Sequence, residues 1–97
     1  MTSKQRAKLR AMANKLSPVL HIGRDGITKN VVHQAWGALE SRELIKVALQ
    51  NGSLYSSARE ASDILCELVH AEPVQCIGKR FTIYRPAREP VIDINGL

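Results

Sequence analysis

Histidine and cysteine are the side chains of this sequence best suited to metal binding or catalysis, and they are few. The histidines are His21, His33 and His70, and the cysteines are Cys66 and Cys76. Cys66 and His70 lie four residues apart, as two ligands on one helix face would, yet no CxxC or HxxxH motif accompanies them. No serine, histidine and carboxylate set has a local signature of nucleophilic catalysis. We therefore expect no metal, no cofactor and no catalytic centre, and we expect both cysteines to lie in apolar surroundings.

The stretch GRDG at residues 23–26 is the second candidate for chemistry, because two glycines flank an arginine at a strand-to-helix junction. A turn alone needs one glycine at most. Gly23 and Gly26 can both adopt positive φ, which frees backbone N–H groups to point outward, and the helix that follows adds its own unpaired N–H groups. Such donors, with the partial positive charge of a helix N-terminus, bind anions. The stretch predicts a phosphate site, with a simple change of chain direction as the alternative.

The spacing of the two glycines narrows the kind of phosphate site. It matches neither the GxxxxGK[ST] pattern of a Walker loop nor the GxGxxG pattern of dinucleotide-binding folds. It resembles instead the GxxG clamp of KH-type domains, which holds a nucleic-acid backbone. Arg24 supplies a cation, whereas the Asp25 carboxylate repels a phosphate unless it caps the next helix near Thr28.

The net charge of +5 is unevenly distributed along the chain. Up to residue 30, seven bases stand against one acid, a net charge of +6, and the remainder carries −1. These bases are Lys4, Arg6, Lys8, Arg10, Lys15, Arg24 and Lys29. Such asymmetry is typical of a surface that meets a polyanion, with a merely solvated basic helix as the alternative.

Some of the cations are better placed than others to contact nucleic acid. Arg6 and Arg10 are four apart in the first helix, so both can face the same way. Lys46 alternates with its apolar neighbours in a strand, so it faces the opposite side of the sheet, where it could reach RNA or simply meet solvent. Lys79 and Arg80 lie in a turn, where solvent exposure explains them.

Apolar periodicity predicts the elements that position these residues. A helical stripe over residues 4–16 ends at Ser17-Pro18, because proline disfavours helix at the residue before it. Thr28 is a suitable N-cap for a second helix, and Ser57 with Glu60 forms a capping-box pattern for a third. The expected helices cover residues 4–16, 29–41 and 57 to the Glu72-Pro73 break, and the expected strands cover 19–22, 44–49, 74–77 and 80–85.

The resulting order, α-β-α-β-α-β-β, predicts an α/β fold in a single domain with a mixed four-stranded sheet and three helices. Strands separated by helices need crossover connections, so we expect them to be parallel neighbours, with the final hairpin as an antiparallel edge. The domain should cover residues 1–86, followed by a tail over 87–97. Expected core residues are Leu9, Leu20, Trp36, Ile45, Val47, Leu65, Leu68 and Ile83.

Composition excludes several classes of protein. No apolar run approaches the roughly 20 residues of a membrane helix. The basic N-terminus lacks the apolar segment of a secretory signal. Two cysteines make no disulfide framework, so we expect a reduced, cytoplasmic protein. We also expect the protein to act as a monomer. Aromatic residues are scarce, which argues against recognition by base stacking.

Three stretches carry a resemblance to a known family: KQRAKLRAMANKLSPVLHIGRDGIT, ALESRELIKVAL and QCIGKRFTIYRP. Over roughly residues 4–86 the sequence resembles the bacterial YhbY-type, or CRM-domain, RNA-binding proteins. The resemblance implies a fold akin to the C-terminal domain of translation initiation factor three. It also implies association with pre-large-subunit ribosomal particles. The family's glycine loop falls on residues 23–26, where Arg24 stands at a position that is usually Lys and Asp25 is a mild departure.

The function expected from charge, loop and resemblance together is RNA binding without catalysis. The protein would be an assembly factor that binds structured large-subunit ribosomal RNA through the basic first helix and the GxxG loop. The expected RNA-binding residues are Lys4, Arg6, Lys8, Arg10, Gly23, Arg24, Asp25, Gly26, Lys29 and Lys46. One alternative is an adaptor whose basic helix binds an acidic protein. The other is a small enzyme on a phosphorylated substrate, with His21 as base.

Overall fold

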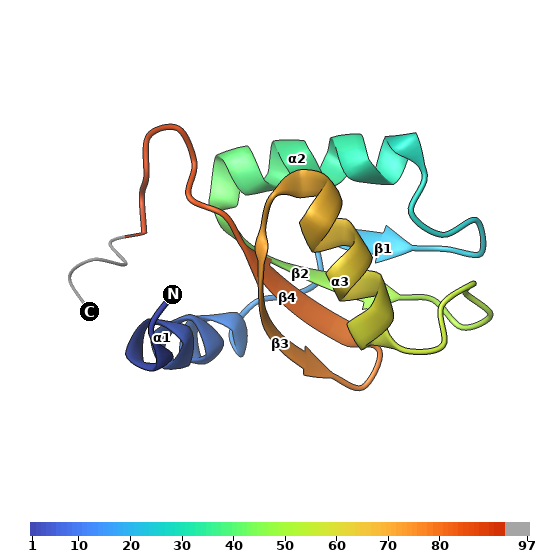
Figure 1. Ribbon diagram of the computed structural model, residues 1–97, viewed down its shortest axis with the longest axis horizontal. Helices are drawn as coiled ribbons and strands as arrows, with labels where there is room; N and C mark the ends of the chain where they lie inside the picture. Colours follow the sequence, from blue (N-terminus) through green and yellow to red (C-terminus); the bar gives the residue numbers. More distant parts are fainter. Residues whose placement is uncertain (93–97) are drawn as a thin grey trace.

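A computed structural model describes residues 1–92, so the last part of the predicted tail, residues 93–97, lies outside the described residues. The helices are α1 (Ser3–Ala13), α2 (Lys29–Arg42) and α3 (Ala58–Val69), and the strands are β1 (Leu20–Ile22), β2 (Leu44–Leu49), β3 (Glu72–Ile77) and β4 (Arg80–Tyr84). Within the described residues the predicted order of three helices and a mixed four-stranded sheet is therefore confirmed (Figure 1).

The strand order is β1-β2-β4-β3, which places the last strand inside the sheet. β1 is parallel to β2, and β4 is antiparallel to both β2 and β3. The prediction that β2 and β3 are neighbours, with the hairpin adding an edge, is wrong because β4 lies between them. Residues 81–84 of β4 are all buried, which is expected for a central strand with a neighbouring strand on each side and helices packed on both faces of the sheet. β3 forms the edge instead, where Pro73 is tolerated beside a β-bulge.

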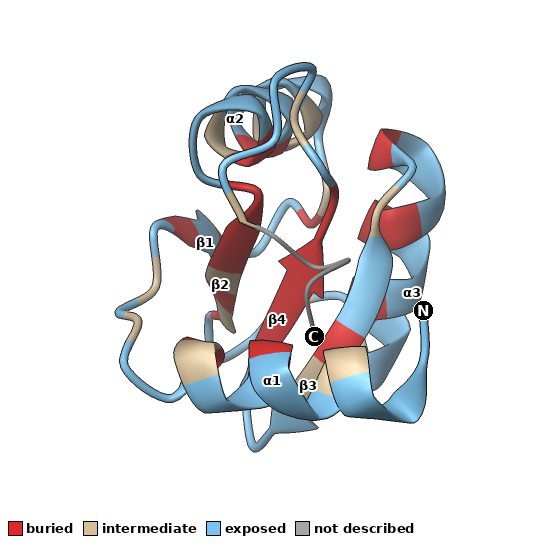
Figure 2. Ribbon diagram, turned by 90° about the vertical axis from the view of Figure 1, so that its left-hand side faces the viewer, coloured by how far each residue is buried: buried red, intermediate tan, exposed pale blue. Residues whose placement is uncertain are grey.

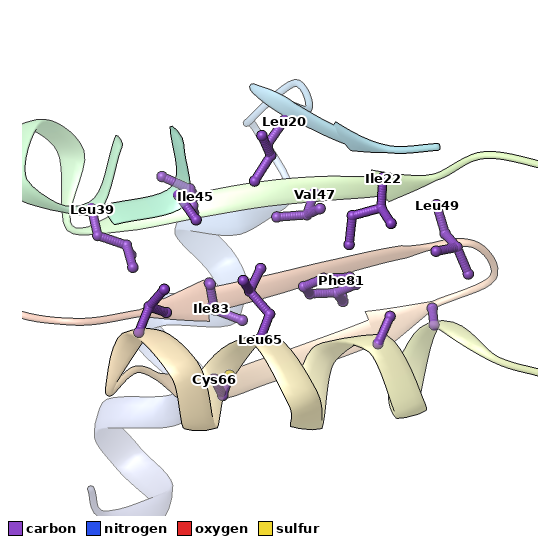
Figure 3. Packing of buried hydrophobic residues seen from close by; sticks show 14 residues of the cluster. Leu20, Ile22, Leu39, Ile45, Val47, Leu49, Leu65, Cys66, Phe81 and Ile83 are labelled. Atoms are coloured by element: carbon purple, nitrogen blue, oxygen red, sulfur yellow. The ribbon is translucent and has the colours of Figure 1, made fainter. Parts of the chain in front are cut away.

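The main core lies between the sheet and the helices α2 and α3 (Figure 3). Alternation along β2 points Ile45 and Val47 into this layer, where they meet Phe81 and Ile83 of the adjacent strand. Burying each such side chain stabilises the fold by roughly 1.5–3 kcal/mol. The predicted burial of Leu20, Ile45, Val47, Leu65 and Ile83 is confirmed, since none exposes more than 4% of its surface.

The opposite face of the sheet is covered by α1, at one end of the strands only (Figure 2). Leu9 and Ala13 of α1 pack against Leu44, Val74 and Tyr84, which form a second, smaller core. The predicted burial of Leu9 is thus confirmed. α1 has one capping box at Thr2 and ends at Ala13, three residues before the predicted end. Further along the strands, Lys46 is only partly covered.

Two residues predicted to lie in the core and one predicted to lie in apolar surroundings are exposed. Trp36 retains 43% of its accessible surface and Leu68 retains 49%. The buried residues of α2 are Ala35 and Leu39, and Trp36, which follows Ala35, lies at the edge of this buried side. Cys76 is exposed on the edge strand, whereas Cys66 is buried and burial raises its pKa to about 11.

Glu43 is a fully buried carboxylate that holds the segment after β4. It follows α2 with φ of 66° and accepts hydrogen bonds from the backbone N–H groups of Ala87, Val91 and Ile92 at 2.7, 2.8 and 2.7 Å. Burial raises the pKa of Glu43, but these N–H groups together outweigh it, so the net pKa lies below its ordinary value. Residues 87–92, predicted as part of a tail, therefore lie beside the C-terminal end of α2 (Figure 1).

Candidate nucleic-acid interface

The glycine loop, residues 23–26, joins β1 to α2 as a tight turn. The Gly26 N–H donates to the Gly23 carbonyl at 3.1 Å, which leaves Arg24 and Asp25 exposed at the tip. Gly26 has φ of 75°, a region in which a side chain is strained, but Gly23 does not have positive φ. The expectation that both glycines need this conformational freedom is therefore correct for Gly26 alone.

Gly26 is also required by packing. A Cβ at this position would lie 2.8 Å from Tyr55 Oη and 3.1 Å from Leu54 Cδ1. The Tyr55 hydroxyl accepts a hydrogen bond from the Ile27 N–H at 2.9 Å, and so joins the glycine loop to the segment before α3. This N–H is thus satisfied within the protein. At Gly23, a Cβ would meet only the movable end of the Gln50 side chain, at 3.1 Å.

Several backbone donors remain for an anion at this end of the molecule. Within residues 1–92, the N–H groups of Arg24 and Asp25 donate to no protein acceptor. The first N–H groups of α2, at Lys29 and Asn30, have no intrahelical partner. These donors, together with the side chains of Arg24 and Lys29, form what we term the glycine-loop site. It can hold a phosphate through charge-assisted hydrogen bonds.

The N-cap of α2 is Thr28, as predicted. Its side-chain oxygen accepts from the Val31 N–H at 3.2 Å, and its carbonyl accepts from the Val32 N–H at 3.0 Å. The suggested alternative, in which Asp25 caps this helix, does not occur. Asp25 therefore stays at the loop tip as a negative charge beside the donors, where it weakens the attraction for a phosphate.

The cations of α1 divide into free and engaged residues. Lys4, Lys8 and Arg10 are exposed. Arg6 is half-buried and its guanidinium donates to the Pro73 carbonyl, so it pins α1 to the edge strand. Arg6 also lines a cleft of about 250 Å³ together with Arg59 of α3. The predicted pairing of Arg6 with Arg10 on a free surface is therefore only half realised.

The basic helix and the glycine loop lie at opposite ends of the molecule (Figure 1). The chain extends 40 Å along its longest axis, with α1 near one end and the loop near the other. β1 runs away from α1, and this direction carries the loop to the far end of the sheet. The charge excess of the first thirty residues consequently forms two separate basic regions.

Lys46 lies between these regions, on the sheet face that α1 leaves partly open. It lines a shallow cleft of about 140 Å³ with Arg80, Gln75, Ile77 and Thr82. From the sequence, Arg80 is expected only to be exposed, because it follows a turn. Its place beside Lys46 comes from the antiparallel pairing of β2 with β4, which the sequence pattern does not show. That pairing brings the two cations to one face.

An exposed aromatic side chain is the other feature that sequence reasoning missed. The Trp36 indole ring lies under the Arg85 guanidinium, whose Cζ is 4.1 Å from the ring centroid. The ring also makes an edge contact with His70, with centroids 6.1 Å apart. Arg85 is buried and is itself held by the Val69 carbonyl at 2.9 Å and the Glu40 carboxylate at 2.7 Å. The scarcity of aromatic residues therefore does not exclude base stacking at this position.

Neither a metal site nor a membrane span is found in the part of the chain that is described. Residues 1–92 contain no group of three His, Cys, Asp or Glu side chains close enough together to hold a metal ion. In the same residues no helix has both the length and the apolar character needed to cross a membrane.

The chain belongs to the CRS1/YhbY (CRM) domain family, whose model matches residues 1–85. It is 34% identical over 90 residues to "Probable RNA-binding protein YqeI" of Bacillus subtilis, with 92% of each chain covered. It is 32% identical over 94 residues to an "RNA-binding protein" of Haemophilus influenzae, covering 97% of this chain and 94% of that one. The resemblance noted in the sequence is therefore confirmed.

A solved structure supports the fold. The solution structure of a Staphylococcus aureus protein, SAV1595, named "a putative RNA binding protein", superposes with a TM-score of 0.78 at 37% identity, and 92% of each chain is covered. The expected likeness to the C-terminal domain of translation initiation factor three stays a prediction.

Proposed function

We propose that this protein binds RNA without catalysing a reaction, and that it acts as an assembly factor of the large ribosomal subunit. Family membership and the names of its relatives support RNA as the partner. The ribosomal role rests on the resemblance to YhbY-type proteins. We further propose that it acts in the cytoplasm as a monomer.

The observation that carries the proposal is the glycine-loop site. Two unpaired N–H groups at the loop tip, two more at the start of α2, and the cations Arg24 and Lys29 gather at one end of the sheet. Phosphates of an RNA backbone match this set of donors, and each phosphate neutralised releases a counterion. Such contacts position the protein on RNA but carry no sequence information by themselves.

The separation of the two basic regions suggests how binding would act on a folded RNA. The glycine-loop site and the exposed cations Lys4, Lys8 and Arg10 would each contact a different backbone segment. A folded RNA that holds two backbone segments as far apart as the two basic regions can bind both at once. An unfolded RNA must lose conformational entropy to bind both, so it binds more weakly. Binding would therefore stabilise one RNA fold or delay a wrong one.

Crosslinking in growing cells, followed by sequencing of the attached RNA, tests the proposal. We expect fragments of large-subunit ribosomal RNA or its precursor, and co-sedimentation of the protein with pre-large-subunit particles. Crosslinks confined to other RNAs would overturn the ribosomal role while leaving RNA binding intact. A comparison of the crosslinks of the wild-type protein with those of Arg24→Ala shows whether they depend on the glycine-loop site.

The two alternatives predict different outcomes. An adaptor for an acidic protein would keep its partner after ribonuclease treatment. A small enzyme would turn over a phosphorylated substrate and would lose activity in His21→Ala, a change that RNA binding through the glycine loop tolerates. Either result would replace the present proposal.

A further inference from the structure

An apolar groove lies beside the glycine loop, between α2 and α3. It is open to solvent and has a volume of about 560 Å³, within the range of small-molecule sites of roughly 300–1,000 Å³. We term it the α2–α3 groove, and its lining residues are Ile27, Thr28, Lys29, Val32, His33, Trp36 and Leu68. The two large apolar side chains that are exposed against expectation, Trp36 and Leu68, both belong to it. Exposed apolar surface gathered in one hollow marks a binding site more often than scattered single residues do.

The Trp36 ring is held in place although it is exposed. Arg85 covers part of the ring and does not line the groove, so the groove opens on a part that Arg85 leaves free. Arg85 cannot easily move, because the Val69 carbonyl and Glu40 bind its guanidinium. A fixed indole loses little conformational entropy when a ligand binds, and therefore suits a stacking contact.

The groove is continuous with the glycine-loop site. Ile27, Thr28 and Lys29 form one wall, and they directly follow Gly26. An RNA strand with a phosphate bound at the N–H groups of Arg24 and Asp25 can therefore continue along this wall into the groove. The titratable side chains that line the groove are Lys29 and His33, with no carboxylate among them, so its charge suits an RNA strand.

We propose that the α2–α3 groove binds an unpaired RNA base, which stacks on Trp36 while a phosphate of another nucleotide of the same strand occupies the glycine-loop site. The proposal rests on the proposed RNA-binding function and narrows its substrate class to RNA with single-stranded or bulged nucleotides. Bases inside a duplex are stacked on one another and cannot enter the groove, whereas splayed bases stack on aromatic side chains. Because every base has a π-face, stacking alone selects unpaired RNA rather than a sequence.

Intrinsic fluorescence provides a direct test, because Trp36 is the only tryptophan of the chain. The full-length protein is titrated with a short single-stranded RNA of mixed sequence and, separately, with the duplex of that strand and its complement. We expect the single strand to quench Trp36 fluorescence and the duplex to leave it nearly unchanged. Trp36→Leu should weaken binding of the single strand about tenfold or more, whereas Trp36→Phe, which retains a π-face, should bind almost like the parent.

Two further variants, one inside the groove and one outside it, test whether the effect is specific to the groove. Leu68→Glu adds charge to the groove at an exposed position and should also weaken binding of the single strand. Val19→Ala, which shortens an apolar side chain of similar exposure (41%) outside the lining of the groove, should not. Thermal melts of all variants show whether each is folded.

The possible failures of the two proposals can be told apart. If both RNAs bind with salt-dependent affinity but neither quenches Trp36, and Trp36→Leu binds like the parent, the groove is not a base site and the RNA-binding proposal survives. If a helical peptide or another protein quenches Trp36 while RNA does not, the groove is a protein-docking site and the present inference is wrong. If neither RNA binds at all, the proposed function itself fails.

Discussion

Single residues of the glycine loop have separable tasks. Gly26 takes a left-handed conformation and leaves room for Tyr55, so it maintains the local structure. Arg24 is exposed at the tip and supports little of the core. Asp25 adds an opposing charge without capping α2. Substitutions within four residues should therefore divide cleanly into those that change stability and those that change binding.

Arg24→Ala should weaken RNA binding about tenfold, because it removes a charge-assisted hydrogen bond worth about 1.5–3 kcal/mol. The melting temperature should stay nearly constant, since the side chain is exposed. Affinity for ribosomal RNA fragments and a thermal melt measure the two effects. Arg88→Ala, at an exposed position in the C-terminal segment, is the matched control, and equal weakening by both substitutions would contradict a role specific to Arg24.

Gly26→Ala should lower stability, because a left-handed residue with a Cβ costs about 1–2 kcal/mol and the Cβ also displaces Tyr55. Each kcal/mol lowers the melting temperature of a domain of this size by about 4–8 °C. Gly23→Ala has no positive φ to strain and should melt close to the parent. If both substitutions leave the melting temperature unchanged, the structural role assigned to Gly26 is wrong.

At the scale of elements, α1 acts both as a structural cover and as a source of charge. Leu9 and Ala13 close the second core, and Arg6 ties the helix to Pro73 of the edge strand. Lys4, Lys8 and Arg10 are left exposed. Only this second group can be changed without disturbing the sheet.

Replacing Lys4, Lys8 and Arg10 by glutamine should weaken binding to all RNAs by similar factors. The slope of log affinity against log salt should fall by roughly 0.7 for each phosphate of a single-stranded RNA that the protein no longer neutralises. Arg6→Ala should instead lower the melting temperature, because it frees the Pro73 carbonyl. Affinities over a salt series and thermal melts separate the two effects.

Controls for this series must be cations that lie apart from α1. Arg59 is unsuitable, because it lines the same cleft as Arg6 and is not an independent position. Arg42 and Arg88, both exposed, are better. Neutralising them should leave the salt slope unchanged. An equal fall in slope would place the RNA surface elsewhere.

At the scale of the whole molecule, the segment after β4 closes the fold by returning to the end of α2. Glu43 accepts from the N–H groups of Ala87, Val91 and Ile92, and Arg85 joins α2 to the end of α3 through Glu40 and the Val69 carbonyl. Hydrogen bonds between distant parts of the chain thus hold both helices and the C-terminal segment. The strength of those at Glu43 should depend on the charge of its carboxylate.

Glu43→Gln should lower the free energy of unfolding by about 1–3 kcal/mol at neutral pH, because the amide cannot replace a carboxylate that accepts three N–H groups. The pKa of Glu43 is lowered in the folded state, so the parent has this stability above the ordinary pKa of 4.5 and loses it as pH falls through the folded value. The difference between parent and variant should therefore shrink as the solution is acidified. Denaturant unfolding from neutral to acid pH measures it.

Truncation after Pro86 tests the same hydrogen bonds from the other partner. Removing residues 87–97 should also destabilise the protein, and the losses from truncation and Glu43→Gln should not add, because both remove the same hydrogen bonds. A truncated chain as stable as the parent would show that the predicted domain boundary at residue 86 is the true end of the fold.

Local patterns in the sequence were sufficient to predict the order of elements, the Thr28 and Ser57 caps and most of the core. These features depend on residues close together in the chain, such as the alternation of Ile45 and Val47 or the apolar spacing of α3. The glycine loop was found in the same way, because a turn and a helix N-terminus are local structures. Family membership likewise followed from stretches of sequence.

Only the tertiary structure decided how these parts meet. Three features depend on pairings between distant segments, which local spacing does not encode: the place of β4 inside the sheet, the cleft that Lys46 and Arg80 share, and the hydrogen bonds from residues 87–92 to Glu43. The exposure of Trp36 depends on which side of α2 packs against the sheet, and that side is the one of Ala35 and Leu39. The direction of β1 separates the basic helix from the glycine loop, because the two ends of a strand lie at opposite ends of the sheet along the strand direction.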